Sequence, residues 1–297
     1  DIYLKNGRFG PYLQFEKEIT RFAPSPTGRL HLGHAFSALF AQKEAEKRSG
    51  RVLLRMENID KARCKTEYET HIREDLRWLG FDWNGEIRRQ SDHIEDYKIA
   101  LQKLQEIGVL YPCFCSRGEI LKEIENSFGA PHNSILGPDG PIYPGTCRSL
   151  TPDLQSEQIA SGKKYALRLD VRKSLNIVGD ISWFDVESGE TRAEPEIFGD
   201  IILARKDVMT SYHLSCTVDD NIQGVSLVTR AEDLTLATHI HRLLQQLLDY
   251  KVPEYKFHKI IVDENGDRLA KRVKSKTIYA MRKEGLTASD IRLAVGL

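Results

Sequence analysis

The stretch Thr20-Arg-Phe-Ala-Pro-Ser-Pro-Thr-Gly-Arg-Leu-His-Leu-Gly-His34 decides the fold that we expect for this chain. A β-prone start, residues 19–23, leads into residues 24–28, where prolines exclude regular structure and a glycine permits a tight turn. His31-Leu-Gly-His34 then opens a helix-like run that ends at residues 49–50. A strand, a Pro/Gly loop and a helix start together present free backbone N–H groups to a phosphate.

Two histidines flank the start of this expected helix. His31 and His34 are three residues apart and are predicted to share one helical face, while Gly33 would let a flat ligand approach the backbone. Loops rich in Pro and Gly are common between strands and helices, and a lone histidine is usually structural. The combination is much rarer, and it favours a nucleotide-binding site.

Composition bounds the class of protein. The chain has 297 residues, of which 40% are hydrophobic and 29% charged, as in an ordinary soluble globular protein. There is no run of about eighteen apolar residues and no export signal, so we expect a cytoplasmic protein without a membrane span. Lys and Arg balance Asp and Glu at 43 each, so any nucleic-acid contact must come from local charge.

A second strand is expected to bring carboxylates to the same edge of the sheet. Arg51-Val-Leu-Leu-Arg-Met56 reads as a buried strand and leads to Glu57 and Asp60. Open α/β sheets bind ligands at the carboxyl ends of their strands, although these two residues could equally be ordinary loop acids. Packing helices are expected over residues 66–79 and 91–107.

Three of the five cysteines form a pattern typical of a metal site. Cys113-Phe-Cys115 precedes a Gly- and Pro-rich excursion, residues 126–144, that returns at Tyr143 and Cys147. Three thiolates favour a tetrahedral zinc ion, and Tyr143 is an unusual but possible oxygen ligand. The alternative is a set of buried, reduced thiols.

The rest of the chain alternates expected strands and helices. Residues 165–171 alternate like a strand with Arg168 and Asp170 on its polar face, and residues 181–189 resemble a hairpin. Tyr212 precedes an apolar stretch. Arg230 ends a strand, and a helix is expected over residues 231–248.

A basic segment follows the last expected strand, residues 256–262. After a turn at residues 263–266, seven basic residues occur from Arg268 to Lys283 without an acidic one. Such a run is usually a solvated face, but a basic loop after a strand also holds triphosphates in their transition state.

These motifs together resemble class I glutamyl-tRNA synthetases. Residues 21–28 with His31-Leu-Gly-His34 are similar to the family's first signature, and Arg268-Leu-Ala-Lys271-Arg272 is similar to its second, usually Lys-Leu-Ser-Lys-Arg. The resemblance covers residues 20–297. It implies an α/β fold, namely a Rossmann-type class I aminoacyl-tRNA synthetase catalytic domain with a zinc-containing insertion.

Within this family the chain most resembles the short paralogues that lack an anticodon-binding domain, because it ends soon after the second signature. That resemblance implies that ATP and L-glutamate form glutamyl-adenylate, with Mg²⁺ accompanying ATP. The glutamyl group would then pass to queuosine in the anticodon of tRNA(Asp). It also implies one structural Zn²⁺ ion held by Cys113, Cys115, Tyr143 and Cys147.

The resemblance assigns the remaining site residues. His31, His34 and Lys271 would be catalytic and, with Gly33, would bind ATP. The residues that would bind glutamate are Arg21, Phe22, Ala23, Pro24, Ser25, Glu57, Tyr212 and Arg230. The chain departs from the family pattern at Arg268 and Ala270, and at Asn58, where an aspartate is usual.

We expect a monomer organised as an N-terminal appendage of unknown role (1–18), two Rossmann halves (19–110 and 196–262), a zinc-containing insertion (111–195) and a C-terminal segment with the basic signature and helices (263–297). Two other functions stay open. One is a truncated glutamyl-tRNA synthetase that charges a tRNA 3′ end, and the other is a catalytically inactive, zinc-stabilised RNA-binding module.

Overall fold

The computed structural model describes residues 2–7, 10–15, 17–128, 136–261 and 276–297. The chain forms two compact units. The first contains residues 1–89, 224–232 and 253–297, and the second contains residues 90–223 and 233–252. These units do not follow the boundaries that we expected at residues 110 and 195, and the expected domain organisation stays a prediction.

The first unit is built on parallel strands. β3 (Ile19–Phe22), β4 (Arg51–Met56) and β5 (Arg88–Arg89) pair in parallel, and so do β13 (Leu227–Ala231) and β14 (Glu254–His258). Hydrogen bonds between Ile19 and Ser226 hold β13 beside β3. Parallel strands place their carboxyl ends at one edge, and this confirms the α/β class that the sequence predicts.

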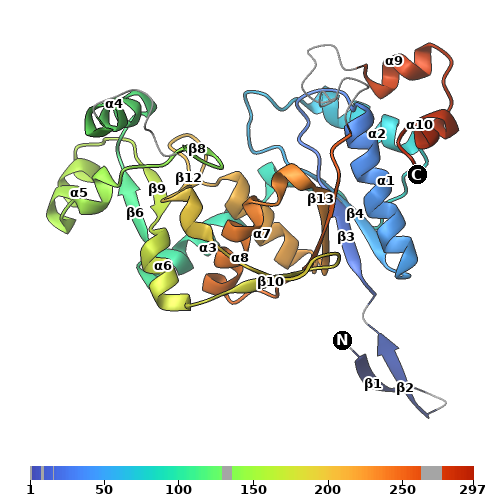
Figure 1. Ribbon diagram of the computed structural model, residues 1–297, viewed down its shortest axis with the longest axis horizontal. Coiled ribbons are helices and arrows are strands. Elements are labelled where there is room, and N and C mark those ends of the chain that lie inside the picture. The colour runs from blue at the N-terminus through green and yellow to red at the C-terminus, as the bar shows by residue number, and fades with distance from the viewer. Residues whose placement is uncertain (1, 8–9, 16, 129–135, 262–275) are drawn as a thin grey trace. The chain divides into compact units, whose positions relative to one another are not determined.

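Helices cover these strands with an apolar core. They are α1 (Leu32–Lys47), α2 (Thr66–Trp78), α9 (Ile278–Lys283) and α10 (Ala288–Ala294). Figure 1 shows α1 running beside β3 and β4. The core includes Phe22, Leu54, Ile72, Leu76 and Ile278, all less than a tenth exposed. Strands β1 (Ile2–Gly7) and β2 (Gly10–Phe15) form an antiparallel hairpin.

Gly50 follows the end of α1, where the chain turns back into β4. Ser49 has a positive φ of 51°, and the N–H of Gly50 donates to the carbonyl of Ala45. A Cβ atom at Gly50 would lie 2.5 Å from the carbonyl oxygen of Glu18, so only glycine lets the chain return into β4 here. The predicted helix end at residues 49–50 is therefore confirmed to within two residues.

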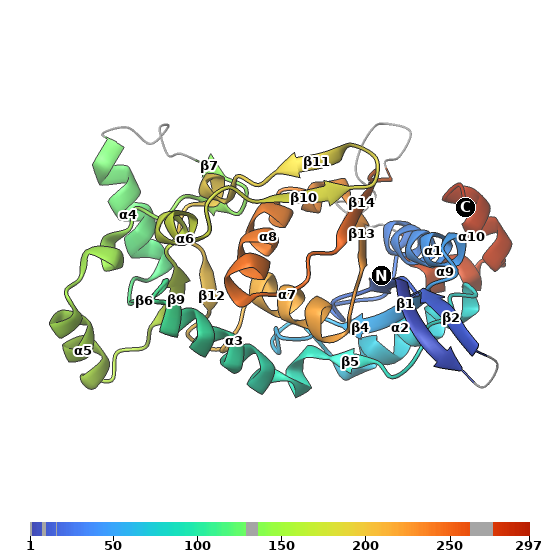
Figure 2. The ribbon, with the colours of Figure 1, turned by 90° about the horizontal axis from the view of Figure 1, so that it is seen from below.

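The second unit packs three helices together, α3 (Ile94–Ile107), α7 (Tyr212–Ile222) and α8 (Ala237–Leu248). Figure 2 shows α7 and α8 side by side. Inside the packing, both carboxylate oxygens of Asp219 accept from the hydroxyl of Tyr97, and one also accepts from the amide of Gln90. The expected helix over 231–248 begins six residues late, because residues 232–234 form a 3₁₀ turn.

An antiparallel sheet completes the second unit. Its order is β12 (Ile202–Ala204), β9 (Ala166–Leu169) and β6 (Leu110–Cys113). The other elements are α4 (Arg117–Phe128), β7 (Leu136–Gly137), β8 (Gly140–Pro141), α5 (Pro152–Ala160), α6 (Val171–Val178), β10 (Ser182–Asp185) and β11 (Gly189–Arg192). The predicted hairpin over residues 181–189 is confirmed by the antiparallel pairing of β10 and β11.

The strand predicted over residues 165–171 is confirmed as β9, but it ends two residues earlier and its Arg168 is buried. β9 ends at Leu169, because the side chain of Asp170 caps α6 by accepting from the N–H of Lys173. Arg168, which alternation places on the polar face of the strand, is only 6% exposed. In the described part of the chain, no helix combines the length and apolar character that a bilayer crossing requires.

Candidate active site and metal centre

The loop after β3 and the segment after β4 lie together in the first unit. The carbonyl of Pro24 accepts from the N–H of Glu57 at 3.0 Å, and that of Pro26 accepts from the N–H of Lys65 at 3.0 Å. The first signature loop and the acidic segment are thus joined through their backbones. The segments that follow neighbouring parallel strands are expected to lie together at this edge of the sheet.

His31 and His34 bind each other across the start of α1. His31 is the N-cap, and its Nδ1 accepts from the N–H of Gly33 at 3.1 Å. The Nδ1 of His34 accepts from the N–H of His31 at 3.3 Å, and the two ring centroids are 3.8 Å apart. The two rings lie side by side, as the expectation of one shared face requires, but His31 precedes the helix with extended backbone.

The surroundings of each ring determine whether it is charged and which of its nitrogen atoms carries the proton. Desolvation by the surrounding protein lowers the pKa of His31, and it lowers that of His34 to about 3 with a smaller contribution from His31. Both imidazoles are therefore neutral near pH 7. Because each Nδ1 accepts a hydrogen bond, the proton of each ring is on Nε2.

Gly33 leaves room for the imidazole ring of His31. A Cβ atom at Gly33 would lie 3.0 Å from Cε1 and 3.2 Å from Nδ1 of His31. The absence of a side chain therefore lets the His31 ring fold back onto the first turn. The expected role of Gly33, close approach of a flat ligand, stays a prediction.

Arg21 and Arg230 occupy neighbouring positions on adjacent strands. Both are 5% exposed, and Nη1 of Arg21 donates to the carbonyl of Thr229 at 3.1 Å. The guanidinium of Arg230 lies 5.4 Å from the ring centroid of Tyr255. Two nearly buried guanidinium groups from β3 and β13 suit a ligand that carries carboxylates.

Glu57 and Asn58 take part in separate polar contacts. Oε1 of Glu57 lies 3.2 Å from Nη2 of the fully buried Arg55. The amide of Asn58 donates to Glu69 at 3.1 Å, and Glu69 also pairs with Arg89 at 2.8 Å. An aspartate at position 58 would place a second carboxylate against Glu69 in this chain, which asparagine avoids.

Tyr212 belongs to the second unit, at the first turn of α7. Its ring lies 5.4 Å from that of His213 and 5.5 Å from that of His241. Both Tyr212 and His213 line a cavity of about 870 Å³ in this unit, where Asp139 lies 2.9 Å from Nε2 of His213. No sequence pattern had indicated that His213 and Asp139 would lie together.

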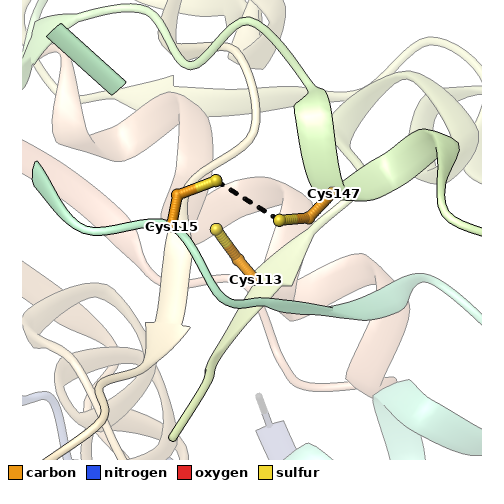
Figure 3. A group of neighbouring side chains, drawn as sticks. All are labelled: Cys113, Cys115 and Cys147. Atoms are coloured by element: carbon orange, nitrogen blue, oxygen red, sulfur yellow. Dashed lines mark hydrogen bonds between the residues drawn. The ribbon is translucent and has the colours of Figure 1, made fainter. Parts of the chain in front are cut away.

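Cys113, Cys115 and Cys147 converge in the second unit (Figure 3). Their Sγ atoms lie within 4.8 Å of one another, and those of Cys115 and Cys147 are 3.4 Å apart. The hydroxyl oxygen of Tyr143 is 3.5 Å from Sγ of both Cys113 and Cys115, and it accepts from the N–H of Cys147 at 2.8 Å.

The two distances from the Tyr143 oxygen to cysteine sulfur atoms fit a tetrahedral zinc ion. With Zn–S bonds of about 2.3 Å and a Zn–O bond of about 2.0 Å, sulfur and oxygen ligands lie about 3.5 Å apart. The two S–O distances match this value. The donor set of three thiols and one phenol oxygen therefore fits the ion that the spacing predicts, and the structure brings all four residues together.

Two residues to which the sequence reasoning gave no part in either site make contacts with residues close to them. The guanidinium carbon of Arg168 lies 3.8 Å from the ring centroid of Tyr143. Nε2 of His258, at the end of β14, lies 3.0 Å from Oγ of Ser37 on α1, between the rings of Phe36 and Phe40. Strand-end position is the one signal that could have marked His258. Lys271, with Arg268 and Ala270, lies outside the described residues.

Comparisons with known proteins give a consistent picture. The family model described as "tRNA synthetases class I (E and Q), catalytic domain" matches residues 18–293. A Glutamyl-Q tRNA(Asp) synthetase from Rhodobacter capsulatus is 44% identical over 284 residues, which cover 94% of this chain and 100% of the relative. One from Nitratidesulfovibrio vulgaris is 39% identical and covers 91% of this chain and 83% of the relative.

A longer relative and a solved structure match as well. A glutamate–tRNA ligase from Aquifex aeolicus is 37% identical over 91% of this chain, which spans 54% of that protein. The crystal structure of a glutamate tRNA ligase from Elizabethkingia meningosepticum superposes with a TM-score of 0.72 at 24% identity, over 91% of this chain and 54% of that one. This structural likeness shows the fold.

Proposed function

Because the chain belongs to the class I glutamyl- and glutaminyl-tRNA synthetase family, we propose that it activates L-glutamate with ATP and transfers the glutamyl group to queuosine in tRNA(Asp). The choice of acceptor is supported by full-length similarity to a relative named for that reaction. In the first step a carboxylate oxygen of glutamate attacks the α-phosphorus of ATP, the bond to the β-phosphate breaks, and pyrophosphate leaves. In the second step a hydroxyl of the acceptor attacks the carbonyl and AMP leaves.

The observation that carries the proposal is the composition of the first unit. It holds two buried arginines on adjacent strands and two neutral histidines at a helix start. Arg21 and Arg230 would bind the carboxylates of glutamate through charge-assisted hydrogen bonds, which favour glutamate over glutamine. Glu57 would hold the α-amino group. Phe22, Ala23, Pro24 and Ser25 would line this pocket, and the part assigned to Tyr212 stays a prediction.

The histidines would act on the phosphate as donors. Nε2–H of His31 and of His34 would hydrogen-bond the α-phosphate oxygens as negative charge develops on them. A neutral donor needs no proton transfer, so the step depends on positioning and on charge stabilisation. Lys271 would neutralise the leaving pyrophosphate, and Mg²⁺ would accompany ATP.

Zinc would have a structural part. Cys113, Cys115, Tyr143 and Cys147 would hold one ion, which when bound supplies four bonds that close the long excursion between Cys115 and Tyr143. All four coordination positions are filled by protein atoms in this arrangement. No position would then be left for a catalytic water.

Glutamate-dependent exchange of pyrophosphate with ATP, measured without tRNA, tests the first step. We expect exchange with L-glutamate and much less with L-glutamine. Arg230→Gln should slow it by about thirtyfold, whereas Arg192→Gln, which removes a surface arginine paired with Asp180, should not slow it. An absence of exchange in the parent protein would favour the catalytically inactive RNA-binding module.

The acceptor is tested by labelled glutamate and three forms of tRNA(Asp). We expect label on queuosine-containing tRNA(Asp), equal label when its 3′-terminal adenosine is removed, and none when guanosine replaces queuosine. Label that requires the 3′ adenosine would instead support the truncated glutamyl-tRNA synthetase. Size-exclusion chromatography would test the expected monomer.

A further inference from the structure

Arg168 occupies a position that a sheet residue seldom has. It is on β9, the middle strand of its sheet, and is only 6% exposed. Its guanidinium carbon lies 3.8 Å from the ring centroid of Tyr143, within the range of a cation–π contact. A buried guanidinium needs partners that compensate for its lost hydration. The residues around Arg168 should therefore supply them.

A polar network holds Arg168 in place. Nη1 of Arg168 donates to the backbone carbonyl of Asp200 at 2.7 Å. The carboxylate of Asp200 is occupied by other donors, which are the hydroxyl of Tyr111 at 2.6 Å, Nη1 of Arg148 at 2.8 Å and the N–H of Val171 at 3.1 Å. The Arg168 side chain is thus fixed by a carbonyl and a ring.

Among the described residues, Arg168 makes no direct hydrogen bond or ion pair with a carboxylate. Nε of Arg168 is buried and has no hydrogen-bond partner among the residues that the structure describes. Its two described contacts are to groups without a formal charge. Through its stacking partner, Arg168 lies next to the thiol cluster, since the oxygen of Tyr143 is 3.5 Å from two of the three Sγ atoms.

We propose that Arg168 is a positioning residue for the zinc centre. It holds the face of the Tyr143 ring so that the phenol oxygen completes the tetrahedron, and its positive charge balances the ligand set. A divalent cation bound by three thiolates carries a net charge of −1 before the phenol contributes. A buried cation stacked on the fourth ligand offsets this charge at short range.

The geometry also accounts for arginine at this position. A planar guanidinium can stack on an aromatic ring and still donate sideways to the carbonyl of Asp200. The compact ammonium of lysine cannot meet both requirements. Arg168→Lys should therefore retain the charge but lose most of the orientation of Tyr143.

Zinc affinity of the full chain tests this inference without reference to enzymatic activity. The zinc-loaded parent, Arg168→Gln and Arg168→Lys are titrated with a chromophoric chelator, and zinc content is checked by mass spectrometry. We expect Arg168→Gln to weaken zinc binding by about tenfold to a hundredfold, the usual effect of losing a group that orients a metal ligand. Arg168→Lys should fall between it and the parent.

A double-mutant cycle separates positioning from a general structural effect. In a Tyr143→Phe background, Arg168→Gln should cost less than about twofold in zinc affinity, because the group through which it acts is gone. Arg148→Gln is the matched control, since it removes a cation from the same Asp200 network without touching the Tyr143 ring. It should keep the affinity of the parent.

Each outcome has a distinct meaning. Parent-like affinity in Arg168→Gln, an equal loss in the Tyr143→Phe background, or an equal loss in Arg148→Gln would overturn the positioning role while leaving the zinc site intact. A parent chain that binds no zinc would overturn both the site and this role. Neither result depends on the proposed tRNA reaction.

Discussion

The Nδ1 atom of His34 accepts a hydrogen bond from the backbone N–H of His31 at 3.3 Å, while Nδ1 of His31 accepts from the N–H of Gly33. The two imidazoles thereby use backbone donors of the first helical turn that we had expected to face a phosphate. The consequence is that these two amides are already engaged, whereas the Nε2–H group of each ring is still a donor.

Gly33→Ala should disable this arrangement. The new methyl would lie 3.0 Å from Cε1 of His31, so the ring must shift by a few tenths of an ångström and its 3.1 Å hydrogen bond to the helix start is lengthened. We expect the rate of glutamate-dependent pyrophosphate exchange to fall by at least about tenfold. Gly118→Ala, in a helix with open space around its Cα, is the control and should keep the parent rate. An unchanged rate in Gly33→Ala would show that the position of the His31 ring does not matter for activation.

The low pKa of His34 predicts how stability depends on pH. Its folded pKa of about 3 lies below the ordinary 6.5, so the unfolded chain binds a proton first as the pH falls. This contribution to stability is complete above pH 6.5 and is lost progressively as the pH falls toward 3. The loss is roughly 1 kcal/mol per pH unit in that window.

His34→Asn should reduce this pH dependence. Asparagine can still accept from the N–H of His31 but does not titrate. Urea unfolding at pH 7.5 and pH 5 should show a smaller difference between the two pH values in the variant than in the parent. An equal difference would mean that the His34 pKa is not depressed in the folded protein.

Arg230→Gln should impair recognition of glutamate more than stability. Losing a charge-assisted hydrogen bond to a substrate carboxylate costs about 2 kcal/mol, or about thirtyfold in kcat/KM. The ratio of activity with glutamate to that with glutamine should fall as well. Thermal unfolding of the variant provides the control for folding. A variant that stays folded and keeps its preference for glutamate would remove Arg230 from the substrate site.

Removal of zinc should destabilise the second unit. The parent is expected to carry one zinc ion per chain, and Cys115→Ser should lose it because a hydroxyl is a poor zinc ligand. Cys64→Ser, at a partly exposed thiol outside the cluster, should keep it. A strong chelator should lower the Tm of the parent and of Cys64→Ser but leave that of Cys115→Ser unchanged. A chelator effect of equal size in Cys115→Ser would refute the ligand assignment.

The local order of elements was predictable from the residues alone. Prolines and glycines between a β-prone start and a helical run indicate a strand, a loop and a helix, because these residues restrict or release the backbone wherever they occur. The Cys-x-Cys pair and the returning cysteine indicated a thiol cluster, because this pattern is typical of a tetrahedral metal site.

Tertiary structure decided what each side chain touches. Local sequence could not show that His31 caps the helix instead of belonging to it, because the ring position depends on the space that Gly33 leaves. Alternation placed Arg168 on a polar face, yet Tyr143 arrives from 25 residues earlier in the chain and covers it. Arg21 and Arg230 are neighbours because β13 lies beside β3, a contact between distant segments. Residue patterns encode backbone preference, whereas burial and charge partners follow from long-range packing.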